Sequence, residues 1–264
     1  MKRNLYLGGQ NMLSINQLIK YLRNHHHITV KSNQAQSLRN IGYYHGYKGY
    51  RFIRTPNQRI PFSSLDEVIA LNKFDMQLKT IIYPKVMFIE NALKSYVIEA
   101  ILHDCRSENL DTIFNKSITD YKSYTPGSQQ YHKQYAKRMT LKGKINNALL
   151  RDYSNKKQTV NHFFNADQPI PIWAIFESLT LGEFGTFFAC SNSNVKLITS
   201  SILHLPSNLD ADGKITEYII YTIKDLRNAV AHNNTIFDTR FQTSTINNRL
   251  VFLLEKEVGI TQCH

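Results

Sequence analysis

The stretch from residue 215 to residue 234 has the periodicity of an amphipathic helix and ends in a group of polar side chains. Its isoleucines recur at helical spacing, and Arg227, Asn228 and His232 follow at the polar end. On a helix, Asn228 and His232 are one turn apart, so the amide can orient the imidazole, while Arg227 and His232 flank a face. A fixed cation beside a titratable imidazole suits phosphoryl chemistry, which needs charge stabilisation and proton transfer.

A similar pattern, Arg39-Asn40 followed by His45, occurs near the N-terminus. It lies in the sequence RNIGYYHGYKGY, where three glycines predict that no regular helix forms. An Arg-to-His spacing by itself is weak evidence, because a chain of this length contains it by chance. The position of Arg227 and His232 on a long helix therefore favours that pair as the chemical site.

Capping signals and apolar periodicity predict a mainly helical chain. Residues 14–17 and 64–67 read as capping boxes that open helices. The second helical pattern continues to about residue 83, where Pro84 either kinks the helix or starts a second one that ends near residue 103. Further helices are expected near residues 34–40, 129–153, 173–190, 194–204 and 248–258, with a loop-rich connector at 104–128 and a small hairpin at 50–62.

Basic residues concentrate in the first 65 positions, which contain no Asp or Glu. The net charge of the chain is +12, and ten Lys or Arg in this region account for +10 of it. This exclusion of acids predicts a surface that faces a polyanion, and the interleaved tyrosines can stack on unpaired bases. A solvated basic face, with the tyrosines packed in a core, explains the same residues. The candidate RNA-binding residues are Arg39, Lys48, Arg51, Arg54 and Arg59 in this region, and Lys133, Lys137, Arg138 and Lys142 in the basic helix at 129–153.

The composition and the absence of known motifs argue against several other classes of protein. Hydrophobic residues make up 42% of the chain, which is enough for a core, and the three separated cysteines predict a reducing cytoplasm rather than a disulfide framework. We expect neither a signal peptide nor a membrane span, because no sustained apolar run occurs. There is no P-loop, GxGxxG, Ser nucleophile elbow, HExxH or two-metal acidic cluster, so we expect no metal and no cofactor.

Several blocks of sequence occur together in one order: IGYYHGYKGYRF at 41–52, ALNKFDMQLKTII at 70–82, FIENALKSYV at 88–97, PIWAIFESLTLGEFGTFF at 171–188 and LRNAVAHNN at 226–234. With these blocks the chain resembles the HEPN superfamily, whose signature is an Arg followed a few residues later by a His. More narrowly, it resembles the bacterial abortive-infection proteins of the AbiD/AbiF type. In that family the pattern continues with a second His, an Arg and Trp-Asn, where this chain has Asn233, Thr235, Phe237 and Asp238.

The resemblance implies an all-α, HEPN-like helical bundle at residues 63–264. A basic, RNA-contacting region at 1–62 would precede it and contain a small β-hairpin or an irregular insertion. Glu90 is implied as a supporting group near the Arg-Asn/His site, although Glu90 and Lys94, at i and i+4, can equally form a surface pair.

The implied function is that of a toxic endoribonuclease in phage defence, which cleaves RNA without metal through Arg227, Asn228 and His232. Two histidines are preferred for two proton transfers, and a homodimer with facing motifs would supply them. The other implied partner is RNA, both as the substrate and as a small structured regulator. The alternative, from a different class, is a catalytically silent RNA-binding or scaffold protein that keeps the HEPN fold, and the departures after His232 favour it.

Overall fold

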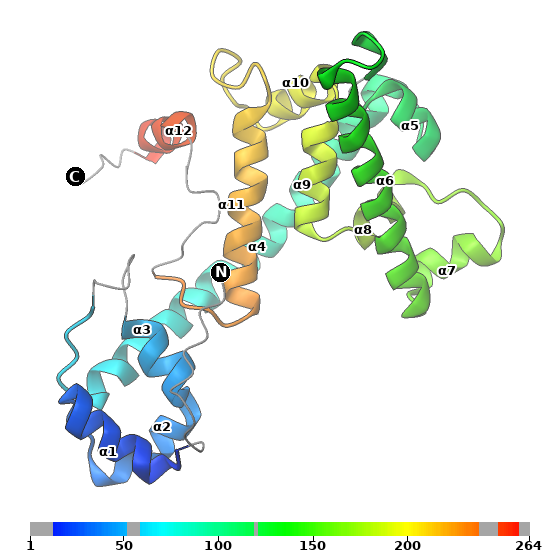
Figure 1. Ribbon diagram of the computed structural model, residues 1–264. Coiled ribbons are helices and arrows are strands. Elements are labelled where there is room, and N and C mark those ends of the chain that lie inside the picture. The colour runs from blue at the N-terminus through cyan, green and yellow to red at the C-terminus, as the bar shows by residue number, and fades with distance from the viewer. Residues whose placement is uncertain (1–12, 52–58, 119–120, 238–247, 259–264) are drawn as a thin grey trace. The chain divides into compact units, whose positions relative to one another are not determined.

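The computed structural model describes residues 13–51, 59–118, 121–237 and 248–258 (Figure 1). Within these ranges the chain is helical, and two isolated backbone bridges stand in place of a sheet. The expected all-α class is therefore confirmed. The helices gather into two compact units: unit 1 is Met1–Pro84 with Leu226–Arg240, and unit 2 is Lys85–Asp225 with Phe241–His264. A functional boundary at residues 62 and 63 stays a prediction.

Unit 1 is built on the first half of the longest helix. The capping box expected at Ser14 is present, because its hydroxyl accepts from the N–H of Gln17 and the Gln17 side chain accepts from the N–H of Ser14. Side chains from successive elements form the core, with Leu22, Leu38 and Leu65 almost fully buried. The elements are α1 (Ile15–His26), η1 (Ser32–Gln34), α2 (Ala35–Ile41), the π-helix η2 (Gly42–Lys48), α3 (Gly49–Arg51) and the first turns of α4 (Leu65–Cys105).

The glycine-rich stretch after α2 differs from the expectation, because it continues as a π-helix instead of breaking the helix. Gly42 starts this element with φ of 79°, a left-handed value that glycine adopts without strain. At Gly46, an added Cβ would lie 2.0 Å from Cγ2 of Ile41, so the turn can close only around glycine. Tyr43 and Tyr47 are buried one turn apart, and their packing supplies the stability that the glycines lack.

Two alternatives were open for residues 50–62, a hairpin or an irregular insertion, and the described residues show no strand there. The expected first strand is wrong, because Gly49–Arg51 is helical and Tyr50 is packed in the interior. The carbonyl of Arg51 accepts from the N–H of Ile60 at 2.8 Å, which joins the ends of the segment. The expected turn, residues 52–58 with Arg54, lies outside the described residues.

Helix α4 runs through Pro84 as one 41-residue helix, so the alternative in which Pro84 starts a second helix is wrong. Proline inside a helix removes one backbone hydrogen bond and crowds the carbonyl four residues earlier, at a cost of about 3 kcal/mol. Buried side chains on either side of it, such as Val68 and Val86, stabilise the helix in both units. The division between the units falls at Pro84.

Unit 2 contains most of the apolar core. Phe176 packs edge to face on Phe184 and Phe187 at its centre, with ring centroids 5.2 and 4.9 Å apart. Helices α5 and η3 occupy the expected connector, and α7 lies where the sequence predicts no helix. No helix among the described residues is long and apolar enough to cross a membrane. The elements are the rest of α4, α5 (Leu110–Lys116), η3 (Tyr121–Ser123), α6 (Gln129–Ser154), α7 (Gln158–Asn165), α8 (Ile172–Ser178), α9 (Leu181–Cys190), α10 (Ser193–Ile202), α11 (Lys214–Ala231) as far as Asp225, and α12 (Asn248–Val258).

The apolar stretch at 173–190 forms two helices, where the sequence predicts one. The break comes at Leu179, and Thr180 caps the start of α9. The Thr180 hydroxyl accepts from the N–H of Glu183, and the Glu183 carboxylate accepts from the N–H of Thr180 at 2.8 Å. The sequence contains the Thr-x-x-Glu pattern of this capping box, but the apolar residues on both sides of it favour one continuous helix.

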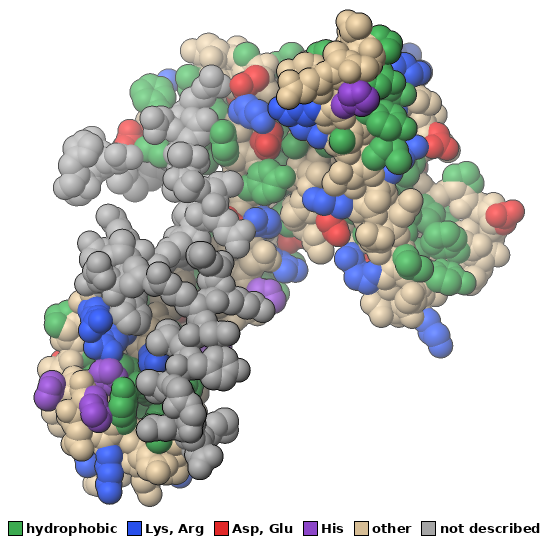
Figure 2. Space-filling model, in the orientation of Figure 1, with side chains coloured by type: hydrophobic (Ala, Val, Ile, Leu, Met, Phe, Trp, Pro, Cys, Tyr) green, Lys and Arg blue, Asp and Glu red, His purple; other side chains and the backbone are tan. Residues whose placement is uncertain are grey.

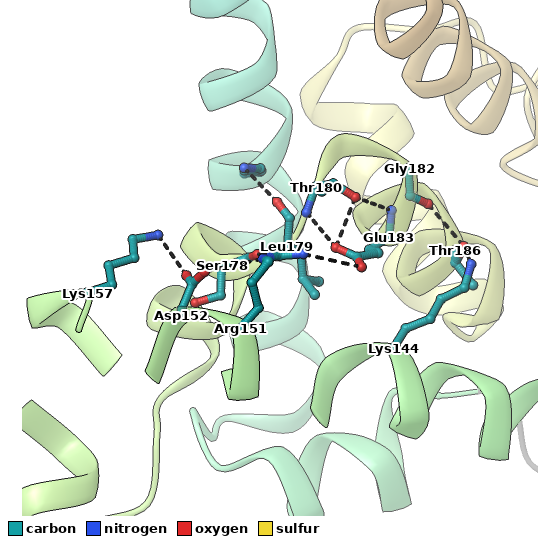
Figure 3. Close-up of polar contacts among 11 residues, drawn as sticks. Lys144, Arg151, Asp152, Lys157, Ser178, Leu179, Thr180, Gly182, Glu183 and Thr186 are labelled. Carbon is teal, nitrogen blue, oxygen red and sulfur yellow. Dashed lines mark hydrogen bonds and ion pairs between the residues drawn. The ribbon is translucent and has the colours of Figure 1, made fainter. Parts of the chain in front are cut away.

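Polar contacts fix the turn between α8 and α9 against α6 (Figure 3). Arg151 donates to the carbonyl of Ser178 and pairs with Glu183 at 3.8 Å. Lys144 donates to the hydroxyl of Thr186 at 2.8 Å. Two basic side chains of α6 therefore stabilise unit 2 from within.

Candidate active site

Helix α11 carries the Arg-Asn/His motif at its C-terminal end. Its first turn is capped by Asp210, whose carboxylate accepts from the N–H groups of Ile215 and Thr216 at 2.6 and 3.2 Å. Of the apolar residues at helical spacing, Ile220 is fully buried, and Ile219, Ile223 and Leu226 are half-buried; Ile215 in the first turn is also fully buried. The apolar face thus holds the helix, and its polar end is available for chemistry.

The end of α11 is a Schellman motif that sets the position of His232. The N–H groups of Asn233 and Asn234 donate to the carbonyls of Val230 and Ala229 at 3.1 and 2.8 Å. Asn233 has φ of 53°, a left-handed value that Asn tolerates better than most residues. His232 therefore occupies the last half-helical position, where its side chain is exposed.

Arg227 and Asn228 contact each other in the last turns of α11. Nη1 of Arg227 donates to Oδ1 of Asn228 at 3.3 Å, and both side chains are half-buried. The backbone carbonyl of Asn228 accepts from the N–H of His232 at 3.0 Å. The Asn228 amide thus orients the guanidinium, where the helical spacing alone suggested that it orients the imidazole.

A buried ion pair on α4 contacts the segment that follows α11. Asp75 and Lys79 pair at 2.7 Å, with 0% and 6% of their side chains exposed. Lys79 Nζ also donates to Oδ1 of Asn233 at 2.8 Å. Oδ1 of Asp75 accepts from the backbone N–H groups of Ile236 and Phe237 at 2.9 and 3.2 Å. One pair therefore holds the side chain next to the motif histidine and the backbone beyond it.

Tyr50 completes this cluster from α3. Its hydroxyl donates to Oδ2 of Asp75 at 3.2 Å and accepts from Nδ2 of Asn72 at 3.0 Å. Burial, together with the Asp75 carboxylate, raises the pKa of Tyr50 to about 12, so the hydroxyl stays protonated as a donor. The Tyr50 ring stacks on Phe237, with centroids 5.9 Å apart.

The sequence did not indicate Asp75, Lys79 or Tyr50 as site residues. The available signal was an Asp and a Lys at i and i+4 inside the block ALNKFDMQLKTII, a spacing that usually marks an exposed helix pair. Burial distinguishes this pair, and burial depends on the segments that cover it. The structure brings the cluster together with Arg227 and His232 in unit 1.

A basic surface with aromatic side chains lies on η2 and α3 of unit 1, and Figure 2 shows Lys, Arg and His side chains on the visible face of this unit. Lys48 Nζ lies 5.3 and 5.2 Å from the ring centroids of Tyr43 and Tyr44. The Arg51 guanidinium lies 5.5 Å from the centroid of Tyr47. Tyr43 and Tyr47 are core residues, whereas Tyr44 is 63% exposed. The alternative in which the tyrosines pack in a core is therefore correct for Tyr43 and Tyr47, whereas the ring of Tyr44 is available to stack on a base.

His26 lies beside this surface and is held in its neutral form. Its Nδ1 is 3.1 Å from Nη1 of Arg51, and its Nε2 is 3.3 Å from the hydroxyl of Tyr43. Burial and then the positive charges of Arg51 and Lys48 lower its pKa to about 4. His26 thus serves as an acceptor that orients Arg51.

The other candidate RNA-binding residues fall into two groups. Arg39 and Arg59 are exposed in unit 1, and Arg39 contacts Gln36. In unit 2, Lys133, Lys137 and Lys142 are exposed on α6. Arg138 on that helix is half-buried and lies over the rings of Phe114 and Tyr121.

Glu90 belongs to unit 2 and forms a buried pair with Lys94, at 3.2 Å, with 9% and 11% of the side chains exposed. The alternative of a surface pair is therefore wrong. Lys94 is drawn inward because it also lies 3.4 Å from the carbonyl of Leu179, at the turn between α8 and α9. A role for Glu90 near the Arg-Asn/His site stays a prediction. Among the described residues, no three His, Cys, Asp or Glu side chains gather as a possible metal site.

A family model described as Abi_2, Abi-like protein, matches residues 36–238, which include both the Asp75–Lys79 pair and the Arg-Asn/His motif. No curated protein and no solved structure matches the chain.

Proposed function

The chain belongs to the family of Abi-like proteins, and we propose that this abortive-infection protein is a HEPN-type endoribonuclease that acts in phage defence. The observation that carries the proposal is the end of α11. There, Asn228 orients the Arg227 guanidinium, and His232 is exposed at the last half-helical position. A cation and an imidazole on one helix end supply two of the groups that RNA cleavage needs, a stabiliser of charge and a base.

The proposed reaction uses the 2′-OH of RNA as its nucleophile. His232 accepts the proton of this hydroxyl, the 2′ oxygen bonds to phosphorus, and the bond from phosphorus to the 5′ oxygen breaks. Arg227 stabilises the negative charge that develops on the phosphorane. The 5′ oxygen leaves with a proton from a second acid, so the products are a 2′,3′-cyclic phosphate and a 5′-OH.

A second copy of the chain would supply that second acid. One His232 transfers one proton at a time, so two copies with facing motifs would place a base and an acid on opposite sides of the phosphate. Sedimentation should therefore show a homodimer. A monomer at all concentrations would contradict this part of the proposal.

The basic, aromatic surface of unit 1 is the proposed RNA-binding face. Tyr44 offers an exposed ring for a base, and Lys48 beside it offers a charge for phosphate. A small structured RNA could occupy the same face as a regulator. The same surface also supports the second candidate function, an RNA-binding or scaffold protein without catalysis.

The experiment that tests the nuclease is cleavage of single-stranded RNA in EDTA, with analysis of the product ends. We expect cyclic phosphate and 5′-OH ends from unmodified RNA. A matched substrate with 2′-O-methyl groups lacks the nucleophile and should stay intact. Binding of both substrates without cleavage of either would favour the scaffold function.

A further inference from the structure

The buried Asp75–Lys79 pair on α4 makes hydrogen bonds to the segment that follows α11, which an ion pair that only stabilises the helix would not need. We propose that Asp75 and Lys79 are positioning residues, which hold His232 in the orientation required for RNA cleavage. This inference rests on the proposed function. Neither residue would touch the RNA, and both would act through the segment at 233–237.

The contacts of the pair fix the segment that directly follows the motif histidine, at residues 233–237. Lys79 fixes the side chain of Asn233, the residue directly after the histidine, and Asp75 fixes two successive N–H groups three and four positions further along. Because Asp75 is fully buried, water does not compete for these N–H groups. The Schellman motif sets the backbone on the helix side of this segment, and the pair sets it on the other.

The charges themselves indicate a positioning role. A buried ion pair is weak evidence for stability, because apolar side chains of similar volume often pack as well. Here each charged group makes directed hydrogen bonds that an apolar side chain cannot make. Three of these bonds end on the segment at 233–237, and a fourth joins Asp75 to Tyr50, whose ring stacks on Phe237 of that segment. The pair therefore selects one backbone conformation after α11.

Other residues of the segment at 233–237 take part in the same arrangement. Asn233 accepts from Lys79, and Phe237 stacks on Tyr50. The hydroxyl of Thr235 lies 3.5 Å from the carbonyl of Gly49. In this chain, these positions anchor the segment.

The test compares Lys79→Met with Lys73→Met, the same change at an exposed position of the same helix. Displacement of a catalytic group by about 1 Å can reduce the rate 10²-fold. We therefore expect Lys79→Met to lower kcat by about 10- to 100-fold with little change in KM, and Lys73→Met to leave both unchanged. Lys79→Arg retains a charged donor and should recover part of the lost kcat.

A second variant covers the case in which Lys79→Met fails to fold. Asn233→Gly removes the acceptor of Lys79 but keeps a residue that adopts left-handed φ, so α11 can still end in the same way. It should lower kcat in the same direction. Circular dichroism at the assay temperature would establish that each variant is folded before its kcat is compared.

A readout without RNA separates this inference from the proposed function. In Lys79→Met, the amides of Ile236 and Phe237 should exchange hydrogen faster, and the NMR signals of the His232 ring should shift; Lys73→Met should show neither change. If wild type does not cleave RNA, the proposed function fails, and the exchange data still test the anchoring. If wild type cleaves and folded Lys79→Met and Asn233→Gly have unchanged kcat, the positioning role is wrong.

Discussion

At the scale of single residues, His26 makes stability depend on pH. Its pKa is lowered from 6.5 to about 4, chiefly by burial and then by Arg51, Lys48, His25 and Arg59, so the folded state disfavours its protonation. The unfolded chain binds the proton first, and this contribution to stability is complete above pH 6.5 and is lost as pH falls towards 4. Denaturant titrations at pH 7 and pH 5 measure this effect. Between these two pH values, the free energy of unfolding should fall less for His26→Gln than for wild type. His45→Gln, at an exposed position, should retain the wild-type dependence.

The sequence could identify individual chemical groups but not their surroundings. Spacing and the blocks around them single out Arg227, Asn228 and His232 as candidate site residues, and their role stays a prediction. Two pairs at i and i+4, Asp75–Lys79 and Glu90–Lys94, had the spacing of exposed helix pairs, and both are buried. Residues distant in the chain bury them, and helical periodicity contains no information on those residues.

At the scale of elements, the break before α9 gives a prediction about stability. Thr180→Ala removes the hydroxyl that caps this helix and should lower the free energy of unfolding by about 1 kcal/mol. Thr140→Ala, at an exposed position inside α6, is the matched control and should change it by less than about 0.5 kcal/mol. Denaturant titration measures both. Equal stability of the two variants would contradict the capping role.

Two regions, 42–49 and 173–190, show why single elements were harder to predict than the all-α fold class. Glycines at 42, 46 and 49 indicated a broken helix, but close packing of Gly46 on Ile41 and burial of Tyr47 override that local preference. The apolar run at 173–190 masked the Thr180–Glu183 capping box. Long periodic segments, such as those of α4 and α11, were readable because packing and propensity agree along them.

At the scale of the whole molecule, the distribution of charge predicts where RNA binds. Changing Arg39, Lys48 and Arg59 to Gln spares the contacts of Arg51 and should weaken binding, with the salt slope falling by up to about one for each lost phosphate contact. The matched triple variant, Lys133, Lys137 and Lys142 to Gln, removes the same charge from unit 2. We expect the unit 1 variant to lose more affinity. The opposite order would move the RNA-binding face to α6.

The proposed cleavage of RNA by His232 together with Arg227 can be tested by comparing single variants with wild type. His232→Ala removes a proton-transfer group, which should lower the cleavage rate by about 10²- to 10⁴-fold in EDTA. Arg227→Lys keeps the charge but loses the planar fork, and should also be impaired. His45→Ala, in the second Arg-Asn/His pattern, should cleave like wild type and remain equally toxic to cells that lack any inhibitory RNA. Equal cleavage by wild type and folded His232→Ala would show that His232 does not take part in the reaction.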